Sequence, residues 1–175
     1  MFGDKSRFFV LKVFYFSDII EKNKSTEMVC QMKTAIVYYS THHGNTKKLL
    51  DALPRDVMLI DAENPSTTDL SAFDRVGFAS GIYGGAFARQ VMNFALEYLP
   101  ERKPVFFVAT AAMKLKNHFV GITHACEKKR AILLGTYICQ GYNTFGPFKL
   151  VGGTSKGHPT QEEIDGFLAF YNGLG

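Results

Sequence analysis

The residues Thr34–Thr46 read TAIVYYSTHHGNT, and this stretch decides the fold. Its first part, Ala35 to Tyr39, is a short apolar run rich in β-branched and aromatic residues, as expected of a strand that is buried on both faces. The second part is small and polar, and Gly44 permits a tight turn. Leucines then follow at helical spacing, which predicts a helix over about Asn45 to Leu53. The stretch therefore predicts a buried strand that passes through a polar turn into a helix.

The same combination repeats along the chain. Further apolar runs predict strands at Val76 to Ala79, Val105 to Ala109 and Ala131 to Ile138, with a weaker one at Val57 to Ile60. Apolar stripes at helical spacing follow them, at Phe87, Val91, Phe94 and Ala95, at Leu115, Phe119, Ile122 and Cys126, and at Ile164, Phe167, Leu168 and Tyr171. Strands that alternate with helices imply right-handed βαβ units. The chain therefore predicts a doubly wound α/β domain in three layers, with a five-stranded parallel sheet between two layers of helices.

The connections between these elements differ in length. Thr160-x-x-Glu163 forms a capping box ahead of the last stripe, so a helix is expected to begin there. The link from Asp61 to Asp74 is short and leaves room only for a small helix around Thr68 to Ala72. The stretch from Cys139 to His158 is long and rich in Gly, Pro, Asn and Thr, and long loops in compact domains are usually functional or mobile.

The first 31 residues differ in composition from the rest. They hold five of the sixteen Phe but only one of the sixteen Gly. We interpret residues 1–31 as a poorly constrained N-terminal extension and residues 32–175 as the domain, with Met32 as a natural start. An extra strand or helix on the domain is the main alternative. A secretory signal is disfavoured, because Asp4 lies where a basic leader belongs and no small-x-small cleavage site precedes Met32.

The composition narrows the function classes. The 175 residues are 46% hydrophobic and 21% charged, and no apolar run approaches the roughly 18 to 20 residues of a membrane-spanning helix. The net charge of +4 comes from scattered residues, so neither nucleic-acid nor membrane binding is expected. The three cysteines show no C-x-x-C spacing, which argues against a disulfide framework or a zinc site and favours a reducing cytoplasm. The Rossmann, P-loop and serine-hydrolase patterns are missing.

The polar turn after the first predicted strand has the chemistry of an anion site. Backbone N–H groups point outward at a helix start, Gly44 permits the turn, and no acidic residue occurs before Asp51. On this interpretation a negative charge at Thr46 would repel a bound phosphate. An ordinary capped turn also favours Ser, Thr and Asn, so that alternative stays open. His42 and His43 are ambiguous, since each could lie near a phosphate or face water.

Ser-Thr-x-x-Gly-Asn-Thr after an apolar strand resembles the FMN-phosphate loop of flavodoxins. Two further loops strengthen the resemblance, Ser80 to Gly85 and Thr110 to Met113, each after a predicted strand. The resemblance covers Lys33 to Leu174, and the segment from Cys139 to Pro159 looks like one found in some bacterial flavodoxin-like proteins. It implies the flavodoxin-like strand order 2-1-3-4-5. It also implies that the flavin ring lies against the second loop, with Tyr83 as a candidate stacking partner.

The resemblance implies a cofactor site for FMN. The residues carried over to it are Ser40, Thr41, His42, His43, Gly44, Asn45, Thr46, Ser80, Gly81, Ile82, Tyr83, Gly84, Thr110, Ala111 and Ala112. No side chain is expected to act as an acid, base or nucleophile, and no metal is expected. The implied function is electron transfer between redox protein partners, a reductase and an acceptor, by a cytoplasmic monomer or weak dimer.

Two alternatives to the electron carrier stay open. One is an FMN-dependent NAD(P)H:acceptor oxidoreductase, and the other is a flavin-free regulatory module that kept only the fold. Residues 32–175 carry 15 Lys+Arg and 12 Asp+Glu, a net of +3, whereas carrier flavodoxins are typically acidic. The third loop lacks the glycine and the aromatic residue often found there. We therefore expect Met113 or a residue of the loop from Cys139 to His158 to cover the outer face of the ring.

Overall fold

The computed structural model describes residues 32–41, 43–65, 69–144 and 152–174. The described residues all lie within one compact unit, Met32–Gly175. The N-terminal extension expected over residues 1–31 and the candidate site residue His42 lie outside the described residues. The account that follows concerns this unit alone.

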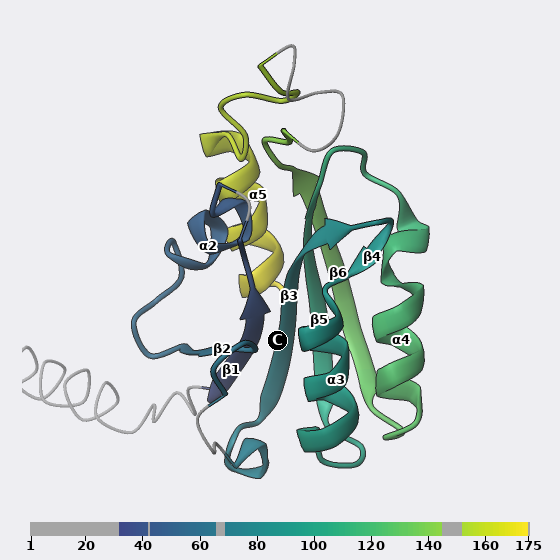
Figure 1. Cartoon of the computed structure of the whole chain (residues 1–175). Coiled ribbons are helices and arrows are strands. Elements are labelled where there is room, and N and C mark those ends of the chain that lie inside the picture. Colours follow the sequence, from purple (N-terminus) through teal and green to yellow (C-terminus); the bar gives the residue numbers. More distant parts are fainter. Residues whose placement is uncertain (1–31, 42, 66–68, 145–151, 175) are drawn as a thin grey trace, which may run out of the picture. The chain divides into compact units, whose positions relative to one another are not determined.

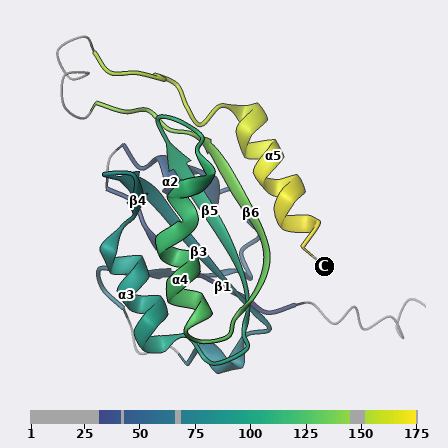
Figure 2. The ribbon, with the colours of Figure 1, turned by 90° about the vertical axis from the view of Figure 1, so that its right-hand side faces the viewer.

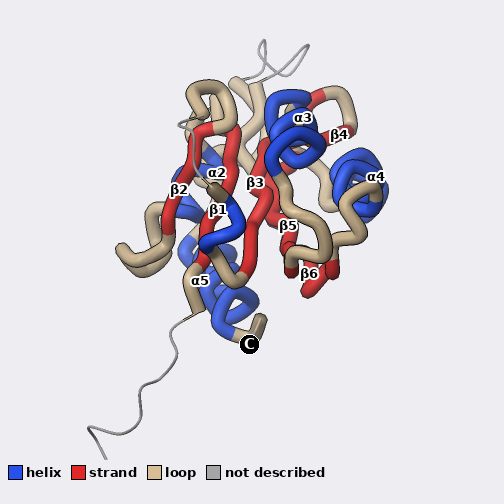
Figure 3. The backbone as a smooth tube through the Cα atoms, turned by 90° about the horizontal axis from the view of Figure 1, so that it is seen from below, coloured by secondary structure: helices blue, strands red, loops and turns tan. Residues whose placement is uncertain are grey.

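Five parallel strands form the sheet, in the order β2-β1-β3-β5-β6. Their bounds are β1 (Thr34–Tyr39), β2 (Met58–Asp61), β3 (Arg75–Tyr83), β5 (Pro104–Ala111) and β6 (Ile132–Gln140). Counting only the parallel strands, this is the order 2-1-3-4-5, so the predicted doubly wound topology is confirmed. A short antiparallel strand, β4 (Ala86–Phe87), pairs with the end of β3. Figure 3 shows the strands as one layer with helices on both sides.

Helices cover both faces of the sheet (Figures 1 and 2). One face carries α2 (Asn45–Leu50) and α5 (Gln161–Asn172), and the other carries α3 (Arg89–Tyr98) and α4 (Val120–Glu127). Two single-turn 3-10 helices, η1 (Leu70–Ala72) and η2 (Lys116–Phe119), lie in the connections. Among the described residues, no helix combines the length and the apolar character that crossing a bilayer requires.

The sheet separates two hydrophobic cores. Neighbouring residues of β5 alternate between them: Phe107 packs in the core under α3 and α4, and Phe106 packs in the core under α2 and α5. Both phenylalanines are fully buried, and such burial stabilises the fold by about 1.5–3 kcal/mol for each side chain. Because both faces of the strand are covered, its sequence is apolar throughout and shows no alternation of apolar and polar residues.

Several element boundaries differ from the sequence-based expectation, most clearly those of α2, β3 and α4. Helix α2 ends at Leu50 and not at Leu53: Asp51 and Ala52 form a turn, and Pro54 disfavours helical conformation at Leu53. Strand β3 runs on to Tyr83, beyond the predicted Ala79, because the turn at Gly84 and Gly85 returns the chain into β4. Leu115 precedes its helix and is exposed, so the stripe predicted to begin there starts later.

The Gly84–Gly85 turn explains the extra strand. Both residues have positive φ, 59° and 90°, as a tight hairpin turn with the twist of the flanking strands requires. Glycine adopts this conformation without the steric cost that other residues meet. The turn therefore converts part of the loop expected over Ser80 to Gly85 into a hairpin that projects from the carboxyl end of β3.

Candidate functional site

A pocket of about 400 Å³ lies where β1, β3 and β5 end. Ligands of open α/β sheets bind beyond the carboxyl ends of the strands, at the point where the strand order reverses. Here β2 lies on one side of β1 and all later parallel strands lie on the other, so the strand order reverses at β1, and the pocket occupies that point. The residues of the sequence-based site that line it are Ser40, Thr46, Gly81, Ile82, Tyr83, Gly84, Thr110, Ala111 and Ala112.

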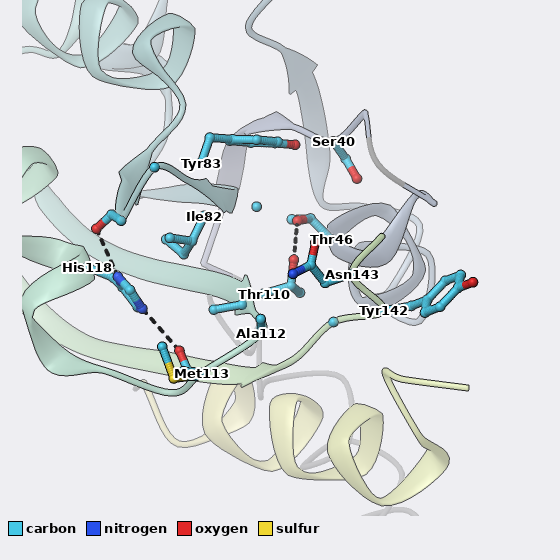
Figure 4. Close-up of a pocket in the computed structure, with 15 residues that line it drawn as sticks. Ser40, Thr46, Ile82, Tyr83, Thr110, Ala112, Met113, His118, Tyr142 and Asn143 are labelled. Atoms are coloured by element: carbon cyan, nitrogen blue, oxygen red, sulfur yellow. Dashed lines mark hydrogen bonds between the residues drawn. The ribbon is translucent and has the colours of Figure 1, made fainter. Parts of the chain in front are cut away.

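The first loop contributes hydroxyl groups to the pocket. The Ser40 hydroxyl accepts a hydrogen bond from the backbone N–H of Lys47 at 3.3 Å, which ties the end of β1 to the first turn of α2. Thr46 and Thr110 both line the pocket, and their hydroxyl oxygens are 2.9 Å apart. Both side chains are almost completely buried, so their hydroxyl groups form a polar pair in the wall of the pocket (Figure 4).

The other residues of the first loop contact the chain after β6. The amide nitrogen of Asn45 donates to the carbonyl of Tyr142 at 2.8 Å. The ring of His43 packs against the Tyr142 ring at a tilt of 39°, with the centroids 4.2 Å apart. His43 Nε2 also lies 2.9 Å from the Thr144 hydroxyl. Neither Gly44, with its positive φ of 63°, nor these two side chains line the pocket. Instead, the contacts of Asn45 and His43 hold residues 141–144 against the first loop.

Tyr83 connects the second loop to the first. Its hydroxyl oxygen accepts from the Thr41 N–H at 3.3 Å and lies 3.1 Å from the Thr41 hydroxyl. The side chain folds back over Gly81, where an added Cβ would come within 2.9 Å of the Tyr83 hydroxyl oxygen. Gly81 is therefore required for this position of the ring, which lies along one side of the pocket (Figure 4). Thr41 itself does not line the pocket.

Ser80, unlike the residues that follow it in β3, lies outside the pocket. It is fully buried and does not line the pocket. Its hydroxyl accepts from the Ala88 N–H at 3.0 Å and donates to the Gly81 carbonyl. These contacts join the end of β3 to the start of α3, so Ser80 holds the hairpin below the pocket.

Sequence reasoning missed several of the residues around the pocket. These are Gly85, Met113, His118, Gly141, Tyr142 and Asn143, of which Met113 and the loop after Cys139 were expected only as a cover for the ring. The backbone N–H of Gly141 donates to the Ala111 carbonyl at 3.0 Å, which brings the chain after β6 to the third loop. An added Cβ at Gly141 would come within 2.9 Å of the Asn45 amide nitrogen. In the sequence, the glycine between Gln140 and Tyr142 was the one signal that could have indicated this close approach.

The site has a polar end and an apolar end. The hydroxyl groups of Ser40, Thr46 and Thr110 lie at the polar end. Ile82, Tyr83, Ala112 and Met113 belong to the apolar end. None of the described residues that line the pocket is Asp or Glu. Such an arrangement suits a ligand with a flat apolar part and an anionic part, because no carboxylate repels the anion.

Comparisons with known proteins place the chain in a family. A family model described as a flavodoxin domain matches residues 36–132. An uncharacterized protein of the archaeon Methanocaldococcus jannaschii is 35% identical over 139 residues, which cover 76% of this chain and 91% of that protein.

The fold is shared with solved structures, of which two serve as examples. A flavodoxin from the domain Archaea has a TM-score of 0.57 at 16% identity, over 78% of this chain and 91% of that one. A flavoprotein of Lactobacillus acidophilus in complex with FMN has a TM-score of 0.51 at 17% identity, over 61% of this chain and 93% of that one. The family match spans more than half of this chain and includes β1, β3 and β5, whose ends form the pocket. The chain therefore belongs to the flavodoxin domain family.

Proposed function

We propose that this protein binds FMN without a covalent bond and passes electrons between redox protein partners. The observation that carries the proposal is the pocket at the ends of β1, β3 and β5, which has hydroxyl groups at one end, an apolar surface at the other and no carboxylate in its described lining. Family membership supports the same ligand, and a structural neighbour from Lactobacillus acidophilus is described as an FMN complex.

The phosphate would bind at the polar end. Ser40 lines the pocket beside the turn into α2, and the first turn of α2 contains no acidic residue. A charge-assisted hydrogen bond to a phosphate oxygen contributes about 1.5–3 kcal/mol. Because α2 has only six residues, the hydroxyl and backbone N–H groups of the loop carry more of this binding than the helix dipole does.

Asn45 does not itself line the pocket, but it contacts Tyr142, which does. The side-chain oxygen of Asn45 is buried without a hydrogen-bond partner among the described residues, while its amide nitrogen is bonded to the Tyr142 carbonyl. An unpaired buried acceptor costs about 1–3 kcal/mol. A ligand hydroxyl that reached this oxygen would remove that cost, so we propose that the sugar-alcohol chain of FMN, which carries hydroxyl groups, binds on the side of the pocket next to Asn45.

The ring would bind at the apolar end. Tyr83 lies along one side of the pocket, and contact of an aromatic ring with the flavin would contribute about 0.5–1.5 kcal/mol beyond burial. Met113 is 66% exposed, so it can pack against a ligand without leaving the core. When bound, FMN supplies the reversible redox chemistry, and the protein residues bind it, orient it and exclude water.

The test is a titration of the purified full chain with FMN, followed by a challenge with NADPH and NADH. We expect the flavin fluorescence to be quenched to a one-to-one end point. We further expect the bound flavin to stay oxidised with pyridine nucleotide alone and to be reduced only when a reductase protein is added. Failure to bind FMN would contradict the proposal. Rapid bleaching by NADPH or NADH alone would replace the electron carrier with an oxidoreductase.

A further inference from the structure

The connection between β5 and α4 exposes apolar side chains beside the pocket. Met113 lines the pocket and is exposed, and Leu115 and Val120 are 42% and 51% exposed. Single exposed apolar residues are common on soluble proteins, but a group of them next to a ligand pocket is typical of a surface that binds another protein. The lysines between them are exposed as well. We call this surface the η2 patch, and its residues are Met113, Lys114, Leu115, Lys116 and Val120.

Buried neighbours hold the η2 patch in place. Phe119 packs in the core under α3 and α4, and His118 is also buried. The two ring nitrogens of His118 lie 2.8 Å from the carbonyl oxygen of Gly85 and 3.0 Å from the carbonyl oxygen of Met113 (Figure 4). The ring thus joins the turn between β3 and β4 to the chain after β5. The exposed side chains of the patch therefore project from an anchored backbone.

The charged residues of the patch are cations. The chain between Glu101 and Glu127 contains no Asp or Glu, although it includes β5, η2 and most of α4. Lys114 Nζ lies 3.8 Å from a carboxylate oxygen of Glu163, and Lys116 forms no ion pair with a described residue. These two lysines stand on either side of Leu115 in the sequence. Positive charges therefore alternate with apolar side chains along the patch.

The carboxylates of the neighbouring elements lie far from the patch. Helix α3 begins with Arg89 and carries its single carboxylate, Glu97, near its other end. Helix α4 ends with Glu127. Both helices begin at the pocket end of the sheet and run back along it, so these two carboxylates lie at the opposite end (Figure 1). After β6, no Asp or Glu occurs before Glu162. The side of the pocket that carries the patch is therefore cationic.

We propose that the η2 patch binds an acidic protein partner, one that presents an apolar contact surrounded by Asp and Glu side chains. The inference rests on the proposed function, because a partner that contacts Met113 lies against the apolar end of the FMN site. Protein interfaces combine an apolar centre with a polar rim, and opposite charges across the rim raise the rate of encounter and fix the orientation.

Other occupants fit the patch less well. A second copy of this chain would bring like charges together, which opposes association. Nucleic-acid binding depends on many phosphate contacts from basic side chains, whereas the patch offers two lysines around an apolar centre. An acidic protein surface satisfies both the charge and the apolar side chains.

The test uses two redox proteins of opposite charge as probes, an acidic ferredoxin and the basic cytochrome c. Each is added to the nitrogen-15-labelled full chain without flavin, and NMR spectra show which backbone amide signals shift or broaden. We expect the ferredoxin to affect the amides of residues 113–120, and we expect about 0.5 M salt to abolish the effect, because salt screens exposed charges. Cytochrome c should leave these signals unchanged. Absence of ferredoxin binding, an equal effect of both probes, or an effect confined to other residues would overturn the proposal.

Two pairs of variants separate the patch from the rest of the surface. Lys116→Glu reverses a charge in the patch, and Lys128→Glu reverses the charge of an exposed lysine after the end of α4. We expect the ferredoxin to bind Lys116→Glu about tenfold more weakly than the wild type, a change of about 1.4 kcal/mol, and to bind Lys128→Glu like the wild type. Leu115→Ser should weaken binding about fivefold, whereas Leu133→Ser, which changes a 47% exposed leucine of β6, should not. Equal losses within either pair would overturn the proposal.

These measurements are independent of FMN binding. Neither Lys116 nor Leu115 lines the pocket, so both variants should bind FMN like the wild type. If the protein does not bind FMN, the proposed function fails, and the NMR titration still decides whether the patch binds an acidic protein. Tighter binding to a DNA oligonucleotide or to anionic phospholipid vesicles than to the ferredoxin would overturn the assignment of a protein partner.

Discussion

At the scale of single residues, the polar end of the pocket depends on three hydroxyl groups in two different environments. Thr46 and Thr110 are almost fully buried and bond to each other, whereas Ser40 is partly exposed and bonds to the backbone of Lys47. Changes at the two threonines therefore affect folding as well as binding. Ser40 is the position at which binding can be changed with the least effect on the fold.

We predict that Ser40→Asp weakens FMN binding by at least tenfold. The Asp side chain can still accept from the Lys47 N–H, so the local structure is retained, but its charge repels a phosphate that binds beside it. The measurement is flavin fluorescence quenching with FMN and with riboflavin, which lacks the phosphate. Ser40→Ala is the matched control and should lose only about 0.5–1.5 kcal/mol, the net contribution of one hydrogen bond. Equal losses for FMN and riboflavin in Ser40→Asp would place the phosphate elsewhere.

A second prediction concerns the Thr46–Thr110 pair. Thr46→Val removes one hydroxyl and leaves the other buried and unpaired, so the free energy of unfolding should fall by about 1–3 kcal/mol. The double variant Thr46→Val with Thr110→Val should recover most of the loss, since it leaves no polar group unsatisfied. Urea denaturation of the set measures both effects. Additive losses in the double variant would show that the two hydroxyl groups do not depend on each other.

The burial of Thr46 also changes one expectation drawn from the sequence. A glutamate at Thr46 was expected to act mainly by repelling a phosphate. Because Thr46 is fully buried, the same change would place a charge inside the protein and destabilise the fold as well. The sequence of the turn predicted that its hydroxyl groups contribute to the site, but it did not show which of them are buried. The hydroxyl that pairs with Thr46 belongs to Thr110, which is 64 residues away in the sequence.

At the scale of elements, Glu163 fixes the start of α5 to the end of β6. Its carboxylate accepts from the Thr160 N–H at 2.9 Å and from the Gln140 N–H at 3.0 Å, and it lies 2.7 Å from His158 Nδ1. The Thr160 side chain accepts from the Glu163 N–H, so the predicted capping box is confirmed. Partial burial opposes the charged form of Glu163, but the bonds from Thr160, Gln140 and His158 outweigh it and hold the pKa of the carboxyl below its ordinary value.

We predict that Glu163→Gln lowers the free energy of unfolding by about 1–2 kcal/mol near neutral pH. A carboxyl whose pKa is depressed by folding contributes stability above its ordinary pKa, and that contribution is lost as the pH falls through the folded-state pKa. The difference between wild type and variant should therefore shrink below about pH 4. Glu162→Gln, in the same first turn but exposed, is the matched control for urea denaturation. A difference that does not change with pH would contradict this role of Glu163.

Elements were predictable where the pattern is long and local. The parallel strands and α5 follow from apolar runs and from a capping box that lies within four residues. Strand β4 was missed because two residues form no pattern, and its existence depends on the Gly84–Gly85 turn. His118 was missed for a related reason, since its partners are backbone carbonyls, which leave no trace in the sequence, and one of them is 33 residues away.

At the scale of the described domain, the sheet separates two cores, and each contains one cysteine. Cys126 packs in the core under α3 and α4, and Cys139 packs in the core under α2 and α5. Burial raises the pKa of the Cys126 thiol to about 12. Burial, with a smaller contribution from the Glu163 charge, raises the pKa of the Cys139 thiol to about 12 as well. Each thiol therefore reports whether its own core opens to solvent.

We predict that neither thiol reacts measurably with iodoacetamide in the native protein at about pH 8, because almost no thiolate is present and both side chains are buried. In a Cys30→Ser background, which removes the third cysteine of the chain, both should become modified at the same rate as urea unfolds the domain. Mass spectrometry of the peptides measures the two rates. Faster modification of one cysteine would show that its core opens separately, contrary to a domain in which both cores share a single sheet.

The central claim is that this pocket holds FMN by its phosphate end, and isothermal titration of the purified full chain with FMN and with riboflavin tests it most directly. We expect one FMN per chain, and we expect riboflavin to bind at least tenfold more weakly because it cannot use the hydroxyl and N–H groups around Ser40. Absence of FMN binding, or equal affinities for the two compounds, would contradict the account.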